Sequence, residues 1–174
     1  MLIDFPIFVA PSFYKLDIGD LPCLIGAFAM GPIPALFIQI IKILIKMLFK
    51  PTSTAFIGEI SAFLFSSVFC ITASALYQRN KTKKGAFKAI LLASLVSVLF
   101  STIVNYGFII EAYANLYHMP LEAIISLGSN IFPIIDDLLS FVLCCVLPFN
   151  IIKTVLIDIL TLLLYKHISP LLKD

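Results

Sequence analysis

The sequence has few charged residues: they make up 13% of its 174 residues, whereas 61% are hydrophobic and the mean hydropathy is +1.09. A soluble domain of this size could not bury that much apolar surface. The apolar runs also lack the polar alternation of strands in an outer-membrane β-barrel. Some runs, such as residues 89–110, reach the roughly 20 residues that a helix needs to cross a bilayer. We therefore predict an all-α, polytopic membrane protein.

Several functional motifs are missing as well. No Gly-rich phosphate loop followed by lysine occurs, so this chain is not expected to hydrolyse ATP. The four cysteines lie in or beside apolar runs without metal-ligand spacing. Asp136 and Asp137 are adjacent and so point in different directions on a helix, and His118 and His167 fall on opposite sides of the predicted membrane. We predict neither an enzyme nor a metal site, and the net charge of +2 indicates no nucleic-acid partner.

The charges that are present lie mostly between the apolar segments and orient the chain. Five basic residues crowd one short connection: Arg79, Lys81, Lys83, Lys84 and Lys88. Short basic loops stay on the cytoplasmic side of a membrane, and a second basic group, Lys166, His167 and Lys173, belongs there too. The expected segments of this single transmembrane domain are an outer loop (1–20), a broken helix or short helical hairpin (21–49), a helix (52–78), the basic loop (79–84), a helix (85–112), an outer loop with a helical segment (113–147) and a last helix (148–168).

The stretch 21–49 is interrupted by Gly31-Pro32-Ile33-Pro34, which must kink it or split it into two short helices. Residues 21–30 span only about 15 Å as a helix, which favours one tilted crossing over a hairpin. Lys42 and Lys46 lie one turn apart on one face, and we expect both to reach toward a head-group region.

Two polar groups are expected to begin helices. Asp20 precedes Leu21 and Pro22, where a carboxylate accepts hydrogen bonds from unpaired amides and meets the positive end of the helix dipole. The run from Thr52 to Thr54 can cap the next helix, which has only Glu59 as a charged residue in its apolar part.

Three polar residues of the apolar spans form the candidate binding site. Asn105 lies near the outer end of its helix, and Asn150 lies at a similar depth near the start of the last helix. Lys153 follows Asn150 by three positions, so these two side chains share one helical face. Pro148 breaks the helical ladder just before them and can turn the preceding segment aside. A ligand chamber open to the outside fits this arrangement.

Lys153 needs a partner inside a membrane, where unpaired polar groups are costly. Asp158 is five residues farther on and poorly placed, whereas Glu59 could approach from another helix. In the alternative interpretation, Lys153 pairs with Glu59 or reaches outward while the asparagines bond between helices. That alternative describes a structural membrane subunit without a ligand.

Several motifs resemble those of one transporter family over nearly the whole chain. They are Phe13-Tyr14-Lys15-Leu16-Asp17, Asp20-Leu21-Pro22, Gly31-Pro32, Gly58-Glu59, Asn105-Tyr106 and, most specifically, Leu147-Pro148-Phe149-Asn150-Ile151-Ile152-Lys153. By these motifs the chain resembles the riboflavin-specific substrate-binding subunits (S components, RibU type) of energy-coupling-factor (ECF) vitamin transporters.

The resemblance implies an ECF S-component-like six-helix bundle, with the first helix apparently missing because Met1 falls about where that helix ends. It also implies that residues 21–49 cross twice as a short hairpin, against the length argument. In the family, one asparagine of the fifth helix, and an asparagine and a lysine at the start of the sixth, hold the flavin ring. These positions fall on Asn105, Asn150 and Lys153.

The resemblance further implies a ligand and partners. Riboflavin is the expected transported ligand, flavin mononucleotide (FMN) is a second candidate, and no cofactor is expected. The expected partners are a membrane coupling subunit of the EcfT type, two ATP-binding cassette subunits and the lipid bilayer of a bacterial cell. Tyr106, Glu59, Leu16 and Asp17 are further candidates for the ligand site. The alternative ligand is another vitamin, such as pantothenate.

Overall fold

The computed structural model describes residues 4–6, 15–17, 19–49, 52 and 54–168, with side chains described for 19–49, 52 and 54–165. Within these residues the chain is helical apart from two short strands and the connections. The elements are β1 (Asp4–Pro6), β2 (Lys15–Asp17), α1 (Asp20–Met30), α2 (Pro32–Phe49), α3 (Ile57–Arg79), α4 (Lys83–Val104), the π-helical η1 (Asn105–Ile109), α5 (Ile110–Leu116), α6 (Leu121–Ser129), α7 (Leu138–Phe141), the π-helical η2 (Val142–Val146) and α8 (Leu147–Ile168). The predicted all-α class is confirmed.

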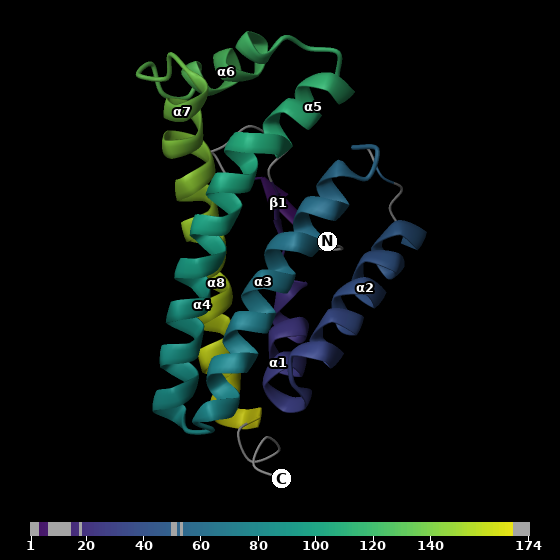
Figure 1. The fold of residues 1–174 in the computed structure, drawn as a ribbon, viewed down its shortest axis with the longest axis vertical. Coiled ribbons are helices and arrows are strands. Elements are labelled where there is room, and N and C mark those ends of the chain that lie inside the picture. Colours follow the sequence, from purple (N-terminus) through teal and green to yellow (C-terminus); the bar gives the residue numbers. More distant parts are fainter. Residues whose placement is uncertain (1–3, 7–14, 18, 50–51, 53, 169–174) are drawn as a thin grey trace.

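Four helical runs in the described part of the chain are long and apolar enough to cross a membrane. They are α2, α3, the run Lys83–Leu116 formed by α4, η1 and α5, and the run Leu138–Tyr165 formed by α7, η2 and α8. In Figure 1, α3 lies between α4 and α2, and α8 packs behind α4. Large apolar side chains such as Leu91, Leu95 and Leu99 are exposed on the outer face of α4, as expected for a helix that faces lipid.

The last helical run begins ten residues before the predicted start at residue 148. Pro148 is the second residue of α8 and lies inside the run rather than at its start. The five residues before α8, Val142–Val146, form the π-helical turn η2. Proline lacks the amide hydrogen and its ring crowds the preceding turn, and the wider π-helical turn accommodates both without ending the helix. The prediction that Pro148 turns the preceding segment aside was therefore wrong.

Helices α1 and α2 form an antiparallel hairpin that turns at Gly31 (Figure 1). Gly31 has a φ of 99°, a conformation that side chains with a Cβ rarely adopt. The two helices pack so closely that a Cβ at Gly26 would lie 2.2 Å from the Cδ1 of Ile38. The length argument for a single tilted helix was thus wrong, and the hairpin implied by the family resemblance agrees with the structure.

The described part of the N-terminal segment, predicted to be an outer loop, forms a small β-hairpin. β1 and β2 pair antiparallel, with Phe5 opposite Leu16 and Pro6 opposite Lys15. In Figure 1 this hairpin lies above the start of α1. The hairpin therefore leads the chain into α1 partway along the bundle.

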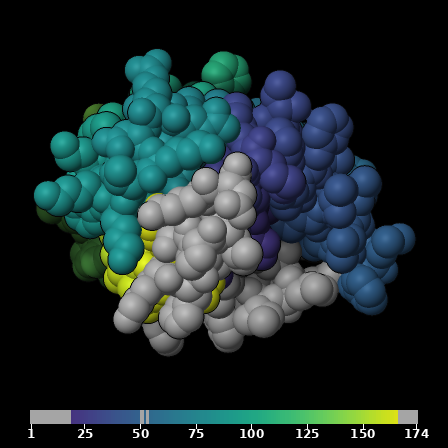
Figure 2. Space-filling view, turned by 90° about the horizontal axis from the view of Figure 1, so that it is seen from below, coloured from purple at the N-terminus to yellow at the C-terminus, as the bar shows by residue number. Residues whose placement is uncertain are grey.

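Different elements lie at the two ends of the bundle. Helix α6 lies across one end (Figure 1), as predicted for part of the segment 113–147. The flanking residues of that segment instead extend the long helices through α5 and α7. The opposite end carries the connection between α3 and α4, next to α1, α2 and the end of α8 (Figure 2). All five basic residues of this connection and its flanks are exposed.

Candidate functional site

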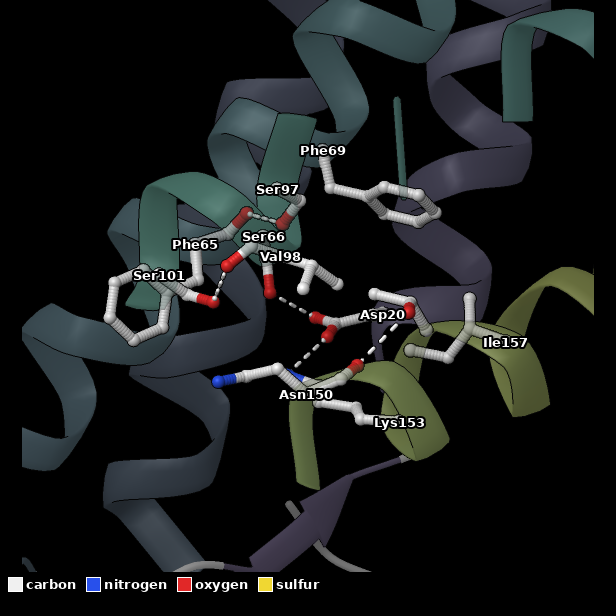
Figure 3. Close-up of a pocket in the computed structure, with 11 residues that line it drawn as sticks. Asp20, Phe65, Ser66, Phe69, Ser97, Val98, Ser101, Asn150, Lys153 and Ile157 are labelled. Carbon is white, nitrogen blue, oxygen red and sulfur yellow. Dashed lines mark hydrogen bonds and ion pairs between the residues drawn. The ribbon is translucent and has the colours of Figure 1, made fainter. Parts of the chain in front are cut away.

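A hollow of about 300 Å³, a volume that includes open solvent, lies among α1, α3, α4 and α8 (Figure 3). Its lining residues are Asp20, Phe65, Ser66, Phe69, Ser97, Val98, Ser101, Asn150, Lys153, Thr154 and Ile157. The core divides into two apolar clusters: Phe69 and Ile157 belong to one, and Phe65 packs against the other. The polar hollow thus lies between two apolar regions.

Asp20 is the most heavily bonded side chain of this hollow. Its Oδ1 accepts from Lys42 Nζ at 2.5 Å and from Ser66 Oγ at 2.5 Å, while its Oδ2 lies 3.0 Å from Lys153 Nζ. The residue at the cap position of α1 is Gly19, and Asp20 is the first residue of the helix. The prediction that a helix begins at Asp20 is therefore confirmed. Asp20 lies in the first turn and uses its carboxylate to join helices.

Lys153 and Asn150 both line the hollow, as expected from their three-residue spacing on α8. Lys153 pairs with Asp20, so both predicted alternatives, pairing with Glu59 and reaching outward, were wrong. Its side chain is only 17% exposed. Asn150 donates from Nδ2 to the backbone carbonyl of Val146 at 3.0 Å, and the backbone carbonyl of Asn150 accepts from Thr154 Oγ1 at 2.9 Å. These contacts place an amide and an ammonium group on the same wall of the hollow.

The two lysines of α2 point into the protein, contrary to the prediction that they reach toward a head-group region. Lys42 binds Asp20, and Lys46 binds Glu59, with side chains only 13% and 18% exposed. Gln39, one turn before Lys42, is fully buried and donates to the Sγ of Cys70. The inner face of α2 is thus polar. Charged side chains in an apolar protein face inward because only the neighbouring helices offer them partners.

Glu59 lies in the first turn of α3 and belongs to a separate polar group. Besides Lys46, its carboxylate accepts from Thr52 Oγ1 at 3.0 Å and from Thr54 Oγ1 at 3.2 Å. Thr54 also accepts from the amide of Gly58, which agrees with the predicted capping role, although α3 begins at Ile57 rather than at residue 52. Glu59 is not among the lining residues of the hollow.

The π-helical turn η1 contains two of the predicted site residues. Asn105 is fully buried and donates from Nδ2 to the carbonyl of Ser101 at 2.7 Å, and Ser101 lines the hollow although Asn105 does not. Tyr106 is 47% exposed. Leu16 and Asp17 lie in β2, and their side chains fall outside the described residues. The structure therefore brings Asn150 and Lys153 together directly, with Asn105 one turn beyond the lining.

Several lining residues were not singled out from the sequence. Ser66, Ser97 and Ser101 supply hydroxyls from α3 and α4, and Phe65 and Phe69 supply aromatic rings. Serines inside apolar spans were the available signal, because hydroxyls there tend to lie between helices. Among the described residues, no group of three or more His, Cys, Asp or Glu side chains could hold a metal ion.

Comparisons with known proteins identify the family of this chain. The family model "ECF transporter, substrate-specific component" matches residues 1–165. This chain belongs to that family. The ECF substrate-specific components form part of a transporter and are not enzymes, and the present chain is accordingly a membrane protein without catalytic chemistry of its own.

Individual relatives extend over nearly the whole of this ECF substrate-specific component. It is 28% identical to the "Riboflavin transporter RibU" of Staphylococcus aureus, covering 98% of this chain and 83% of that protein. It is 25% identical to the "Riboflavin transporter FmnP" of Bacillus subtilis, covering 98% and 84%. A solved structure reported as "Structure and mechanism of the S component of a bacterial ECF transporter" matches with a TM-score of 0.71 and 28% identity, covering 98% of this chain and 87% of the other.

Proposed function

We propose that this chain is the riboflavin-binding subunit of an ECF-type importer, which captures riboflavin from outside the cell. The observation that carries the proposal is the hollow whose lining includes Asn150 and Lys153 as well as the rings of Phe65 and Phe69. The names of the relatives from Staphylococcus aureus and Bacillus subtilis supply the ligand. The lining offers both polar side chains and aromatic rings to a small molecule.

The chemistry of riboflavin suits these side chains. The pyrimidine edge of its ring system alternates carbonyl acceptors with one amide donor, and an asparagine amide serves both kinds of group. A lysine ammonium has three donors, so Lys153 can keep its bond to Asp20 and also donate to an electron-rich edge. Phe65 and Phe69 offer apolar surface to the dimethylbenzene end of the ring. Asn105, one turn beyond Ser101, completes the proposed ring-binding set.

The proposed setting is the cytoplasmic membrane of a bacterium, which the chain crosses several times. The exposed basic connection between α3 and α4 would face the cytoplasm, because short basic loops are retained there. The proposed partners are a coupling subunit of the EcfT type and two ATP-binding cassette subunits, which would supply the energy of transport. In this proposal residues 1–174 form a single transmembrane domain.

A titration of the purified chain in detergent tests the proposed ligand. Riboflavin absorbs and emits visible light, which protein side chains do not, so its fluorescence can be followed directly. We expect the fluorescence to be quenched on binding at micromolar riboflavin or below, and FMN is titrated in parallel. Pantothenate serves as the control ligand and should not displace riboflavin. A folded preparation that binds no riboflavin at micromolar concentration would contradict the proposal.

A further inference from the structure

Three charged side chains from three different helices form one ion-paired group, and two of them, Asp20 and Lys153, line the hollow. Asp20 of α1 binds Lys42 of α2 through Oδ1 and Lys153 of α8 through Oδ2. We propose that Asp20 is a positioning residue for ligand binding: its carboxylate fixes the ammonium group of Lys153 at the wall of the hollow. This proposal rests on the proposed function, because it concerns the same ligand site.

The carboxylate is itself held rigidly, which is what an anchor requires. Ser66 of α3 donates to Oδ1 at 2.5 Å, alongside Lys42, and the side chain of Asp20 is only 3% exposed. The α1 helix also offers its positive dipole end to a carboxylate in its first turn. Lysine, by contrast, has a long flexible stem that loses much conformational freedom when it is fixed. By fixing Lys153 before the ligand arrives, Asp20 reduces the ordering that binding itself requires.

A double-mutant cycle between Asp20 and Lys153 tests whether one residue acts through the other. Riboflavin affinity is measured for the wild-type chain, Asp20→Asn, Lys153→Met and the double variant. We expect Asp20→Asn to weaken binding about tenfold when Lys153 is present, and less than about twofold when residue 153 is methionine. Equal weakening in both backgrounds, or unchanged affinity of Asp20→Asn, would overturn the proposal.

Two further measurements separate positioning from a general loss of structure. The absorption spectrum of bound riboflavin should shift in Asp20→Asn toward the spectrum seen with Lys153→Met, and Asp20→Glu should restore part of the wild-type affinity. Lys46→Met is the matched control, since it breaks the other ion pair of α2 away from the hollow. If Asp20→Asn does not fold, the cycle is repeated with Lys42→Met in all four variants, which removes one of the two cations that Asp20 neutralises.

The possible failures are distinguishable. A wild-type chain that does not bind riboflavin overturns both the proposed function and this inference. Binding that Lys153→Met leaves unchanged overturns the role of Lys153 and hence that of Asp20, while riboflavin binding itself stands. Binding that Lys153→Met weakens and Asp20→Asn leaves unchanged overturns only the positioning role of Asp20.

Discussion

Helices α1, α3 and α8 are joined at two levels of the bundle, and the two levels use different chemistry. At the first level, which we call the charged level, Asp20 of α1 binds Ser66 of α3 and Lys153 of α8. All three side chains line the hollow. Charged and hydroxyl groups here take the place of apolar packing, and space remains among the helices.

At the second level, which we call the aromatic level, the same three helices are joined by rings. Phe28 of α1 lies 4.5 Å from Tyr77 of α3 between ring centroids, and Tyr77 lies 6.0 Å from Tyr165 of α8. The two tyrosine hydroxyls share one hydrogen bond of 2.9 Å. Lys153 and Tyr165 are twelve residues apart on α8, or about 18 Å. The helices enclose a hollow at the charged level, where charged side chains join them. They pack closely at the aromatic level, where rings join them.

The largest expected effect on stability is at the charged level. Asp20→Asn removes the buried carboxylate that Lys42 and Lys153 share, so both ammonium groups lose this ion pair. We expect a loss of about 3 to 5 kcal/mol in the free energy of unfolding, the usual cost of breaking a buried ion pair. Denaturation of the purified chain in detergent measures it. A loss no larger than that of Tyr165→Phe would mean that the two levels do not differ in this way.

The next largest expected effect is on the affinity for riboflavin, and only the charged level should show it. Asn150→Leu keeps the approximate size of the side chain but removes the amide from the hollow. We expect the binding free energy of riboflavin to become less favourable by about 1 to 3 kcal/mol, because the polar edge of the ligand then loses its partner. Tyr165→Phe, at the aromatic level, is the control and should bind riboflavin as tightly as the wild-type chain. Equal weakening by both variants would contradict the assignment of the site.

A smaller effect is expected at the aromatic level. Tyr77→Phe or Tyr165→Phe leaves the other hydroxyl buried without its partner, at a cost of about 1 kcal/mol each in the free energy of unfolding. The double variant should cost less than the sum, because both polar groups are then gone. Thermal unfolding of the four proteins in detergent gives the coupling. Strict additivity would show that the shared hydrogen bond contributes nothing.

The smallest effect lies outside both levels, at an exposed helix start. Asp137 caps α7: its carboxylate accepts from the hydroxyl of Ser140 at 2.5 Å and from the amide of Ser140 at 2.7 Å, and these hydrogen bonds lower the pKa of Asp137. Because the pKa is lower in the folded chain, the contribution to stability is present above about pH 4 and is lost as the pH falls further. Asp137→Asn should flatten this part of the pH dependence of the unfolding temperature. An unchanged pH profile would contradict the cap.

The sequence predicted the long helices well because apolar runs of sufficient length leave few alternatives in a membrane. It also placed Asn150 and Lys153 on one face, since a three-residue spacing fixes direction on any helix. It did not identify Asp20 as the partner of Lys153. That pairing depends on how α1, α2 and α8 are arranged and rotated relative to one another, and the residue spacing within one helix does not predict this arrangement.

A usable signal for Asp20 was nevertheless present in α2. Gln39, Lys42 and Lys46 recur on one face of an otherwise apolar helix, which indicates a polar face directed toward other helices. The π-helical turns η1 and η2 had no such signal. They depend on how neighbouring helices crowd a turn, and only Pro148, next to η2, marked one of the two places.

The inward-facing lysines of α2 bear on how the chain enters the bilayer during synthesis. Each lysine at the centre of a helix adds about 2.5 to 3.5 kcal/mol to the cost of insertion by the translocon, and α2 carries both Lys42 and Lys46. Their partners lie in the neighbouring helices: Asp20 is 22 residues earlier in the chain and Glu59 is 13 residues later. We therefore expect α2 to leave the translocon together with α1 and α3, as one unit whose charges are already paired.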